Sequence, residues 1–286
     1  MLEVQNLSVL IQGKQVLRQV SLTVPKGKVV GIIGESGSGK SVLCSTILQL
    51  FRKDRTAAGT IKFNGECLLS LEEKKMRSLR GKEIALIMQN PMSMFNPLVT
   101  IGGHFIETLQ AHTSMTKKQA IKIAKEQLAL FQLNDVDVLK KYPHELSGGM
   151  LQRIMIAISA SLEPKLLLAD EPTTALDTMT QLEIVKELKK LQARTKMSIL
   201  IVSHDLGVIA NLAEEIIVMR RGVVVEYGPA SHILLHPIHP YTKTLVAARD
   251  EHSTLDELND KYEDTVSGEL VLYDESHWVR MEGSSR

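Results

Sequence analysis

Apolar and polar residues alternate, or form short β-branched runs, along the first part of the chain. Two such runs, residues 9–11 and 16–17, flank the turn-forming Gln12-Gly13, which predicts an antiparallel meander. Another hairpin is predicted where Asn64-Gly65 separates two strand-like segments. The antiparallel β part is therefore expected at about residues 1–30 and 59–69.

Continuous apolar runs recur later and alternate with helical patterns. They lie at residues 29–33, 84–88, 166–169 and 199–202. Runs of this kind are typical of strands that are buried on both faces of a parallel sheet. Strands that alternate with helices favour right-handed connections within one sheet. The pattern therefore predicts an α/β fold whose core is a mainly parallel sheet, followed by a hairpin at residues 216–225.

A helical block interrupts this core. Apolar residues at 121, 124, 128 and 131 follow the period of an amphipathic helix that opens near Met115. We expect a helical insertion at about residues 91–160, within one domain that covers residues 1–249. The chain then becomes polar and acidic, so residues 250–286 are expected to form a C-terminal appendage with one strand-like segment at 269–273.

The charge of the chain is balanced, with 34 Lys+Arg against 33 Asp+Glu and a formal net charge of +1. Proteins that bind nucleic acid by counterion release carry a basic surface, so nucleic acid is not expected as a partner. The sequence shows neither a signal-peptide pattern nor an apolar run of about 18 residues, which favours a cytosolic protein that does not span a membrane itself. Cys44 and Cys67 form no C-x-x-C pair and are interpreted as structural thiols.

The strongest chemical signal is a match to G-x-x-x-x-G-K-[ST] between an apolar run and a helical pattern. The backbone N–H groups of such a loop, together with the positive end of the helix that follows, bind the phosphates of a nucleoside triphosphate. Lys40 is expected to reach the β- and γ-phosphates, and Ser41 to place its hydroxyl on Mg²⁺. The predicted binding residues are Gly34, Glu35, Ser36, Gly37, Ser38, Gly39, Lys40 and Ser41.

A pair of carboxylates follows the apolar run at residues 166–169. Ligands of open α/β sheets bind beyond the carboxyl ends of the strands, so these acids are expected near the phosphate loop. Asp170 is predicted to hold Mg²⁺, directly or through water. Glu171 is predicted to polarise an attacking water, which phosphoryl transfer needs besides positioning and charge neutralisation.

Further segments resemble the ATP-binding cassette (ABC) family, in the order that this family has them. Residues 146–153 (LSGGMLQR) are similar to its signature sequence. The resemblance implies a P-loop NTPase core with ATP as the nucleotide. It also implies that Gln89 is the lid glutamine that touches Mg²⁺ or water, that Asp177 belongs to a dimer-contacting loop at 175–177, and that His204 senses the γ-phosphate.

The signature has a physical reading of its own. Ser147, Gly148 and Gly149 at a helix N-terminus make a second anion site. One chain does not need two such sites for one nucleotide, so this one is expected to serve the ATP of a facing subunit.

Residues 87–97 and 239–243 (HPYTK), with the signature, resemble the peptide and nickel importer branch, and most of all nickel or metal-chelate importer ATPases. This resemblance implies an ATPase at the cytoplasmic face of the cell membrane. Its partners would be a second, distinct ATPase subunit, two permease subunits and an extracytoplasmic solute-binding protein. Two alternatives stay open: the same machine with di- or oligopeptides as cargo, and a soluble ABC ATPase without a role in transport.

One position departs from the family pattern. The family usually places an aromatic residue in the first hairpin, where it stacks on adenine. The corresponding position here is about Ile11, and no Phe, Tyr or Trp occurs before Phe51. The sequence therefore predicts that adenine is held loosely.

Overall fold

The computed structural model describes residues 1–50, 54–133, 136–174, 176–251, 268–274 and 276–281. The chain divides into two compact units: Met1–Leu71 with Leu200–Arg286, and Glu72–Ile199. Within the described residues, no helix is both long enough and apolar enough to cross a membrane.

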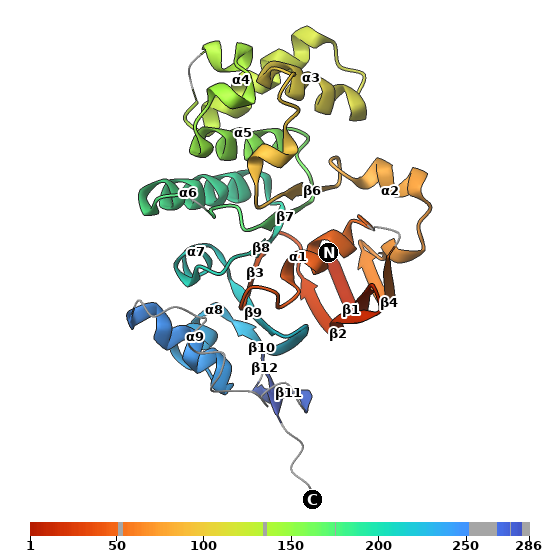
Figure 1. Cartoon of the computed structure of the whole chain (residues 1–286), viewed down its shortest axis with the longest axis vertical. Coiled ribbons are helices and arrows are strands. Elements are labelled where there is room, and N and C mark those ends of the chain that lie inside the picture. Colours follow the sequence, from red (N-terminus) through yellow and green to blue (C-terminus); the bar gives the residue numbers. More distant parts are fainter. Residues whose placement is uncertain (51–53, 134–135, 175, 252–267, 275, 282–286) are drawn as a thin grey trace, which may run out of the picture. The chain divides into compact units, whose positions relative to one another are not determined.

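The first unit contains an antiparallel sheet with strand order β2-β1-β4-β5, seen in red and orange in Figure 1. Its strands are β1 (Leu2–Ile11), β2 (Lys14–Val24), β4 (Arg55–Phe63) and β5 (Glu66–Cys67). The β4–β5 hairpin turns at Asn64 and Gly65, both with positive φ, as a two-residue turn requires. The predicted antiparallel part of the chain is confirmed, although β4 begins four residues before the expected position 59.

A second sheet of the first unit has the order β11-β12-β10-β9-β3-β8. The strands are β3 (Val29–Ile33), β8 (Ser198–Val202), β9 (Glu215–Arg220), β10 (Val223–Pro229), β11 (Glu269–Asp274) and β12 (His277–Met281). β3 pairs with β9 in parallel, and every residue of β3 is buried. The remaining pairs, from β9 outward to β11, are antiparallel. This sheet is therefore mixed, with its parallel part at β3.

The described residues of the first unit form five helices: α1 (Lys40–Ile47), the 3-10 helix η1 (Leu68–Ser70), α7 (Leu206–Leu212), α8 (Ala230–Leu235) and α9 (Pro240–Glu251). The elements predicted from the sequence do not include α8 and α9. α9 begins at Pro240, and proline is well tolerated in the first turn of a helix. Of the proposed C-terminal appendage, residues 252–267, 275 and 282–286 lie outside the described residues. Its described strand β12 pairs with β10 of the sheet.

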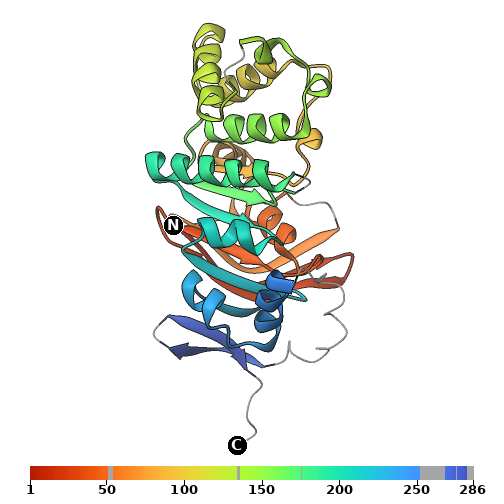
Figure 2. The same cartoon turned by 90° about the vertical axis from the view of Figure 1, so that its left-hand side faces the viewer.

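The second unit contains the parallel pair β6 (Ile84–Ile87) and β7 (Leu166–Asp170), and β8 leads the chain from this unit into the first. Its helices are α2 (Glu73–Leu79), η2 (Pro91–Met94), α3 (Ile101–His112), α4 (Lys117–Leu130), η3 (Val136–Lys140), η4 (Pro143–Glu145), α5 (Gly148–Ala160) and α6 (Thr178–Thr195). α3, α4 and α5 pack against one another, and Figures 1 and 2 both show them as one group.

Local sequence explains where these helices begin. Thr116 caps α4, and its side chain and that of Gln119 form a reciprocal capping box. Ala124 and Leu128 are buried, and Phe131, at the C-cap, is buried as well, as the periodicity predicts. The helix ends at Leu130.

Candidate functional site

The predicted phosphate loop connects β3 to α1 in the first unit. Gly34, Gly37 and Gly39 all have positive φ, at 152°, 81° and 101°. A Cβ atom at Gly34 would lie 2.1 Å from the carbonyl oxygen of Met219, and one at Gly39 would lie 2.5 Å from Cδ2 of Leu17. Side chains are therefore excluded at two of these glycines by the backbone angle and by neighbouring atoms together.

Lys40 closes this loop. Its Nζ donates to the carbonyl oxygens of Gly34, at 2.7 Å, and of Glu35, at 2.8 Å. The ammonium group thus lies over the inside of the loop at the N-terminus of α1, where a helix favours anions. Ser41, the next residue, is exposed, so its hydroxyl is accessible to a metal ion. This donor set fits a nucleoside phosphate with Mg²⁺.

Residues far away in the sequence hold the loop in place. The hydroxyl of Tyr241, on α9, accepts a hydrogen bond from the backbone N–H of Glu35 at 2.9 Å. The guanidinium of Arg220 lies 4.8 Å from the centre of the Tyr241 ring, a cation–π contact. The N–H of Gly222 donates to the carbonyl oxygen of Ser38 at 3.1 Å. Sequence reasoning missed these supports; the only signal was the HPYTK segment at 239–243, which contains Tyr241.

Burial shifts the pKa values of Tyr241 and Arg220. The pKa of Tyr241 is raised, mainly by burial and also by the nearby charge of Glu35. The pKa of the Arg220 guanidinium is lowered from its ordinary value, again mainly by burial. The phenol keeps its hydrogen at neutral pH, and its oxygen accepts from the N–H of Glu35.

His204 also belongs to the first unit. It is exposed and lies between β8 and α7, in the segment just before Asp205. Asp205 caps α7, because its carboxylate accepts hydrogen bonds from the N–H groups of Gly207 and Val208. The cap fixes the course of the chain directly after His204.

In the second unit, the predicted acids follow β7. Asp170 is the last residue of the strand, and Glu171 has a φ of 49°. Positive φ is uncommon for a residue with a side chain, and such backbone strain concentrates at functional sites. Oγ1 of Thr174 donates to the Glu171 carboxylate at 2.6 Å. The strained backbone and this hydrogen bond together set the direction of the Glu171 side chain.

The signature residues form the N-terminus of α5. Oγ of Ser147 accepts from the N–H of Met150 at 3.3 Å, an N-cap. A Cβ at Gly148 would meet nothing within 4 Å, whereas one at Gly149 would lie 3.3 Å from Cγ2 of Thr180. Gly148 thus faces open space, and an incoming group can approach the backbone there.

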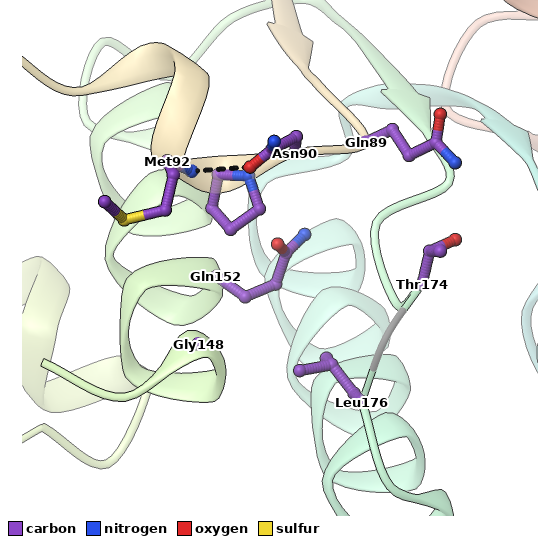
Figure 3. Close-up of a pocket in the computed structure, with 8 residues that line it drawn as sticks. Gln89, Asn90, Met92, Gly148, Gln152, Thr174 and Leu176 are labelled. Atoms are coloured by element: carbon purple, nitrogen blue, oxygen red, sulfur yellow. Dashed lines mark hydrogen bonds between the residues drawn. The ribbon is translucent and has the colours of Figure 1, made fainter.

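One pocket of the second unit brings several predicted residues together. It has a volume of about 560 Å³ and lies between the segment after β6, the start of α5 and the loop before α6 (Figure 3). The lining residues are Gln89, Asn90, Pro91, Met92, Gly148, Gln152, Thr174 and Leu176. Gln152 is buried and donates through Nε2 to the carbonyl oxygen of Pro172, so it ties α5 to the loop after β7. Gln89, the predicted lid glutamine, and Gly148 of the predicted signature therefore line one pocket.

Asp177 caps α6 at the edge of this loop. Its carboxylate accepts from the N–H of Thr180 at 3.0 Å and from the Thr180 hydroxyl at 2.7 Å. These hydrogen bonds lower the pKa of Asp177 below 3.8. Ala175, the first residue of the predicted dimer-contacting loop, lies outside the described residues.

The predicted site residues thus fall into two sets. The phosphate loop and His204 belong to the first unit, and Gln89, the signature, Asp170, Glu171 and Asp177 belong to the second. Phosphate-binding backbone, a lysine, a hydroxyl, carboxylates and a histidine are the groups that nucleotide hydrolysis uses.

Comparison with known proteins identifies the class. Residues 17–174 match the model of the ABC transporter family, and the chain belongs to that family. Among solved structures, it is similar to a dimeric ATP-binding cassette in a post-hydrolysis state with bound ADP and Pi. The TM-score is 0.73 with 28% identity, and the match covers 80% of this chain and 99% of that one. The predicted P-loop α/β fold is confirmed.

Individual relatives within the ABC transporter family are ATP-binding proteins of transport systems. The chain is 40% identical to the metal-staphylopine import system ATP-binding protein CntD of Staphylococcus aureus, over 88% of this chain and 91% of that protein. It is 42% identical to the dipeptide transport ATP-binding protein DppD of Haemophilus influenzae, over 88% of this chain and 78% of that protein. The chain is an ATP-binding subunit whose ATPase activity is coupled to transport.

Proposed function

We propose that this chain powers the import of a metal chelate across the cell membrane. The observation that carries the proposal is its similarity to the metal-staphylopine ATPase, which extends over 91% of that protein. The dipeptide transport ATPases are as similar in identity but match over a smaller share of their length, 78% and 72%. Import of di- or oligopeptides by the same machine is therefore the second candidate.

The phosphate loop is proposed to hold the nucleotide. Residues 34–39 supply backbone N–H groups other than that of Glu35, which donates to Tyr241. Lys40 turns from the carbonyl oxygens of its own loop to the phosphate oxygens. Tyr241 supports this proposal, because its hydroxyl binds the backbone N–H of Glu35 and so holds the loop in place. Mg²⁺, when bound, neutralises phosphate charge; Ser41, Asp170 and Gln89 are the residues proposed to hold it.

The remaining residues are proposed to act on the attacking water. Glu171 would accept a proton from that water as a general base, and His204 would hydrogen-bond the γ-phosphate. The Thr174 hydroxyl supports the role of Glu171, since its hydrogen bond orients the carboxylate without adding a charge.

The partners are inferred from the signature. Gly148 and its neighbours Ser147 and Gly149 are proposed to face the ATP of a second ATPase subunit, with Asp177 near the contact. We infer a heterodimer of ATPases at the cytoplasmic face of the membrane, with two permeases and an extracytoplasmic solute-binding protein.

Reconstitution of the complete complex tests the cargo. The chain is co-expressed with its partners and placed in vesicles, and ATP-dependent uptake of a labelled nickel chelate is compared with that of a labelled dipeptide. Mass spectrometry identifies cargo that purifies with the binding protein. Uptake of the chelate supports the proposal, and uptake of the dipeptide alone replaces it with the second candidate. Absence of ATP-dependent uptake of either cargo, in a complex that hydrolyses ATP, contradicts an importer of these classes.

A further inference from the structure

Three potential metal ligands meet at the outer edge of the second sheet, in the first unit. They are His232 on α8, Asp274 at the end of β11 and His277 at the start of β12. One ligand atom from each lies within 4.8 Å of the others. Oδ2 of Asp274 is 4.0 Å from Nδ1 of His232 and 4.0 Å from Nδ1 of His277. In both views the β11–β12 hairpin, in dark blue, lies beside the blue helices (Figures 1 and 2).

The buried carboxylate of Glu226 orients His277 from the other side. Oε1 of Glu226 lies 2.7 Å from Nε2 of His277, and neither side chain is more than 3% exposed. The same carboxylate accepts backbone hydrogen bonds from Ile238 and His239, at 2.8 and 3.1 Å. Because an ionised carboxylate only accepts, Nε2 of His277 carries the hydrogen, and Nδ1 is the ring nitrogen that lies toward Asp274.

Other contacts orient the Asp274 carboxylate and make room for the His277 ring. The N–H of Ser276 donates to Oδ1 of Asp274 at 3.3 Å, which leaves Oδ2 as the atom nearest both imidazoles. Gly228 makes room for the His277 ring, since a Cβ there would lie 3.2 Å from Cδ2 of His277. The side chains of His232 and Asp274 are each 45% exposed, so an ion can enter from solvent.

We propose that His232, Asp274 and His277 bind a divalent transition metal ion of the zinc class, with Glu226 as the hydrogen-bond partner that orients His277. A metal-ligating histidine commonly donates its second N–H to a carboxylate in this way. Two imidazoles and one carboxylate are ordinary zinc ligands, and a water completes the tetrahedron. Ligand atoms in such a site are about 3.4 Å apart, so each must move by less than about 1 Å from its present position.

The ion would connect three elements. α8 supplies one ligand, and the two strands of the hairpin supply the others. Bound metal would therefore stabilise the β11–β12 hairpin against local opening, because an ion that binds the closed form shifts the equilibrium toward it. If the three side chains formed only surface ion pairs, the stability of the hairpin would not depend on a metal.

Zinc titration of the full, nucleotide-free chain tests the proposal, after treatment with a chelator. The parent is expected to bind one Zn²⁺ that His232→Ala and Asp274→Ala lose. Both side chains are half-exposed, so these variants are expected to fold. Glu226→Gln should weaken binding by about 10- to 100-fold. The matched control is His236→Ala, an exposed histidine just after α8 that is outside the cluster and should keep the parent's affinity.

Two further readouts keep the result specific. Co²⁺ in place of Zn²⁺ should give the intense visible absorption of a tetrahedral ion in the parent and not in His232→Ala. Hydrogen exchange at the amides of β11 and β12 should slow when Zn²⁺ is added. Equal zinc affinity of the parent, His232→Ala and Asp274→Ala would overturn the proposal, as would a parent that binds no zinc at micromolar concentrations.

Discussion

Two residues of the site illustrate opposite ways of placing a charge. Lys40 is directed by a helix and by carbonyl oxygens at 2.7 and 2.8 Å, all within six positions of it in the sequence. Glu171 is directed by an uncommon backbone angle, with φ at 49°. The position of Lys40 can be predicted from the glycine-rich pattern. The positive φ of Glu171 cannot be predicted from the Ala-Asp-Glu-Pro segment in which it lies.

Lys40→Ala is expected to weaken nucleotide binding and to abolish hydrolysis with it. Hydrogen bonds to charged groups contribute about 1.5–3 kcal/mol each. Loss of one corresponds to about a 10- to 150-fold drop in affinity. Titration with a fluorescent ATP analogue measures this change, with Lys26→Ala, an exposed lysine outside the loop, as the control. Unchanged nucleotide affinity in Lys40→Ala would contradict the assignment.

Ile11→Tyr is expected to tighten ATP binding. Ile11 ends β1, where it pairs with Lys14 and Arg55, and it is half-buried. A ring that stacks on a base contributes about 1–3 kcal/mol, which is about 5- to 150-fold in affinity.

Titration calorimetry with ATP and GTP measures the effect of Ile11→Tyr. The control is Leu10→Tyr, because adjacent residues of a strand point to opposite faces and only one of them can face the base. The Mg²⁺ requirement should stay unchanged in both variants. Equal ATP affinity of Ile11→Tyr and the parent would mean that position 11 is not beside adenine.

At the scale of elements, α9 supports the phosphate loop through a single side chain. Tyr241→Phe keeps the ring against Arg220 but removes the oxygen that accepts from the N–H of Glu35. An unsatisfied buried donor costs about 1–3 kcal/mol. We therefore expect a looser loop and an ATP affinity lower by up to about 100-fold.

The comparison variant for Tyr241→Phe is Tyr227→Phe. Tyr227 is another tyrosine of the first unit, and its hydroxyl donates to Glu215 rather than to the loop. Both variants should lower the melting temperature, but only Tyr241→Phe should change the dissociation constant of ATP. Equal ATP affinities of the two variants would show that the Tyr241 hydroxyl has no positioning role.

The α6 helix carries a buried carboxyl group that makes stability depend on pH. Glu187 is 3% exposed, and burial raises its pKa above 4.5 while the charge of Arg153 opposes the shift. In the window between the unfolded and folded pKa values, the folded state holds more protons than the unfolded state. This group therefore stabilises the fold least at high pH, once its carboxyl is ionised in both states.

Glu187→Gln should accordingly raise the melting temperature near pH 7–8, and the gain should shrink as the pH falls toward 4.5. Thermal unfolding of the full chain across this range measures it. The control is Glu183→Gln. Glu183 is more exposed than Glu187 and forms an ion pair with Arg153, so its replacement should not stabilise the protein at any pH. A constant or absent gain for Glu187→Gln would contradict the assigned shift.

At the scale of the whole molecule, sequence patterns are most informative where a function depends on contiguous residues. The phosphate loop, the carboxylate pair and the signature are predicted from spacing along a loop or a helix start, and their roles stay predictions. The strands predicted at 84–88 and 166–169 are present and pair in parallel. Long apolar runs leave few alternatives for such segments.

Contacts between distant residues could not be predicted in this way. The Tyr241–Glu35 hydrogen bond joins positions 206 residues apart, and the His277–Glu226 pair joins positions 51 apart. Only the tertiary fold brings the two members of each pair together. The sequence pattern also did not predict the helices α8 and α9; α9 begins at Pro240, a residue that the first turn of a helix tolerates.

The central claim is that this chain hydrolyses ATP to drive transport, with Glu171 acting on water. ATP turnover in the reconstituted complex, with and without cargo, tests it most directly. Glu171→Gln is nearly the same size and can keep the Thr174 hydrogen bond. We predict that this variant retains ATP, accumulates a closed ATPase dimer and loses turnover, whereas turnover of the parent rises with cargo. Equal, cargo-stimulated turnover of Glu171→Gln and the parent would contradict the account.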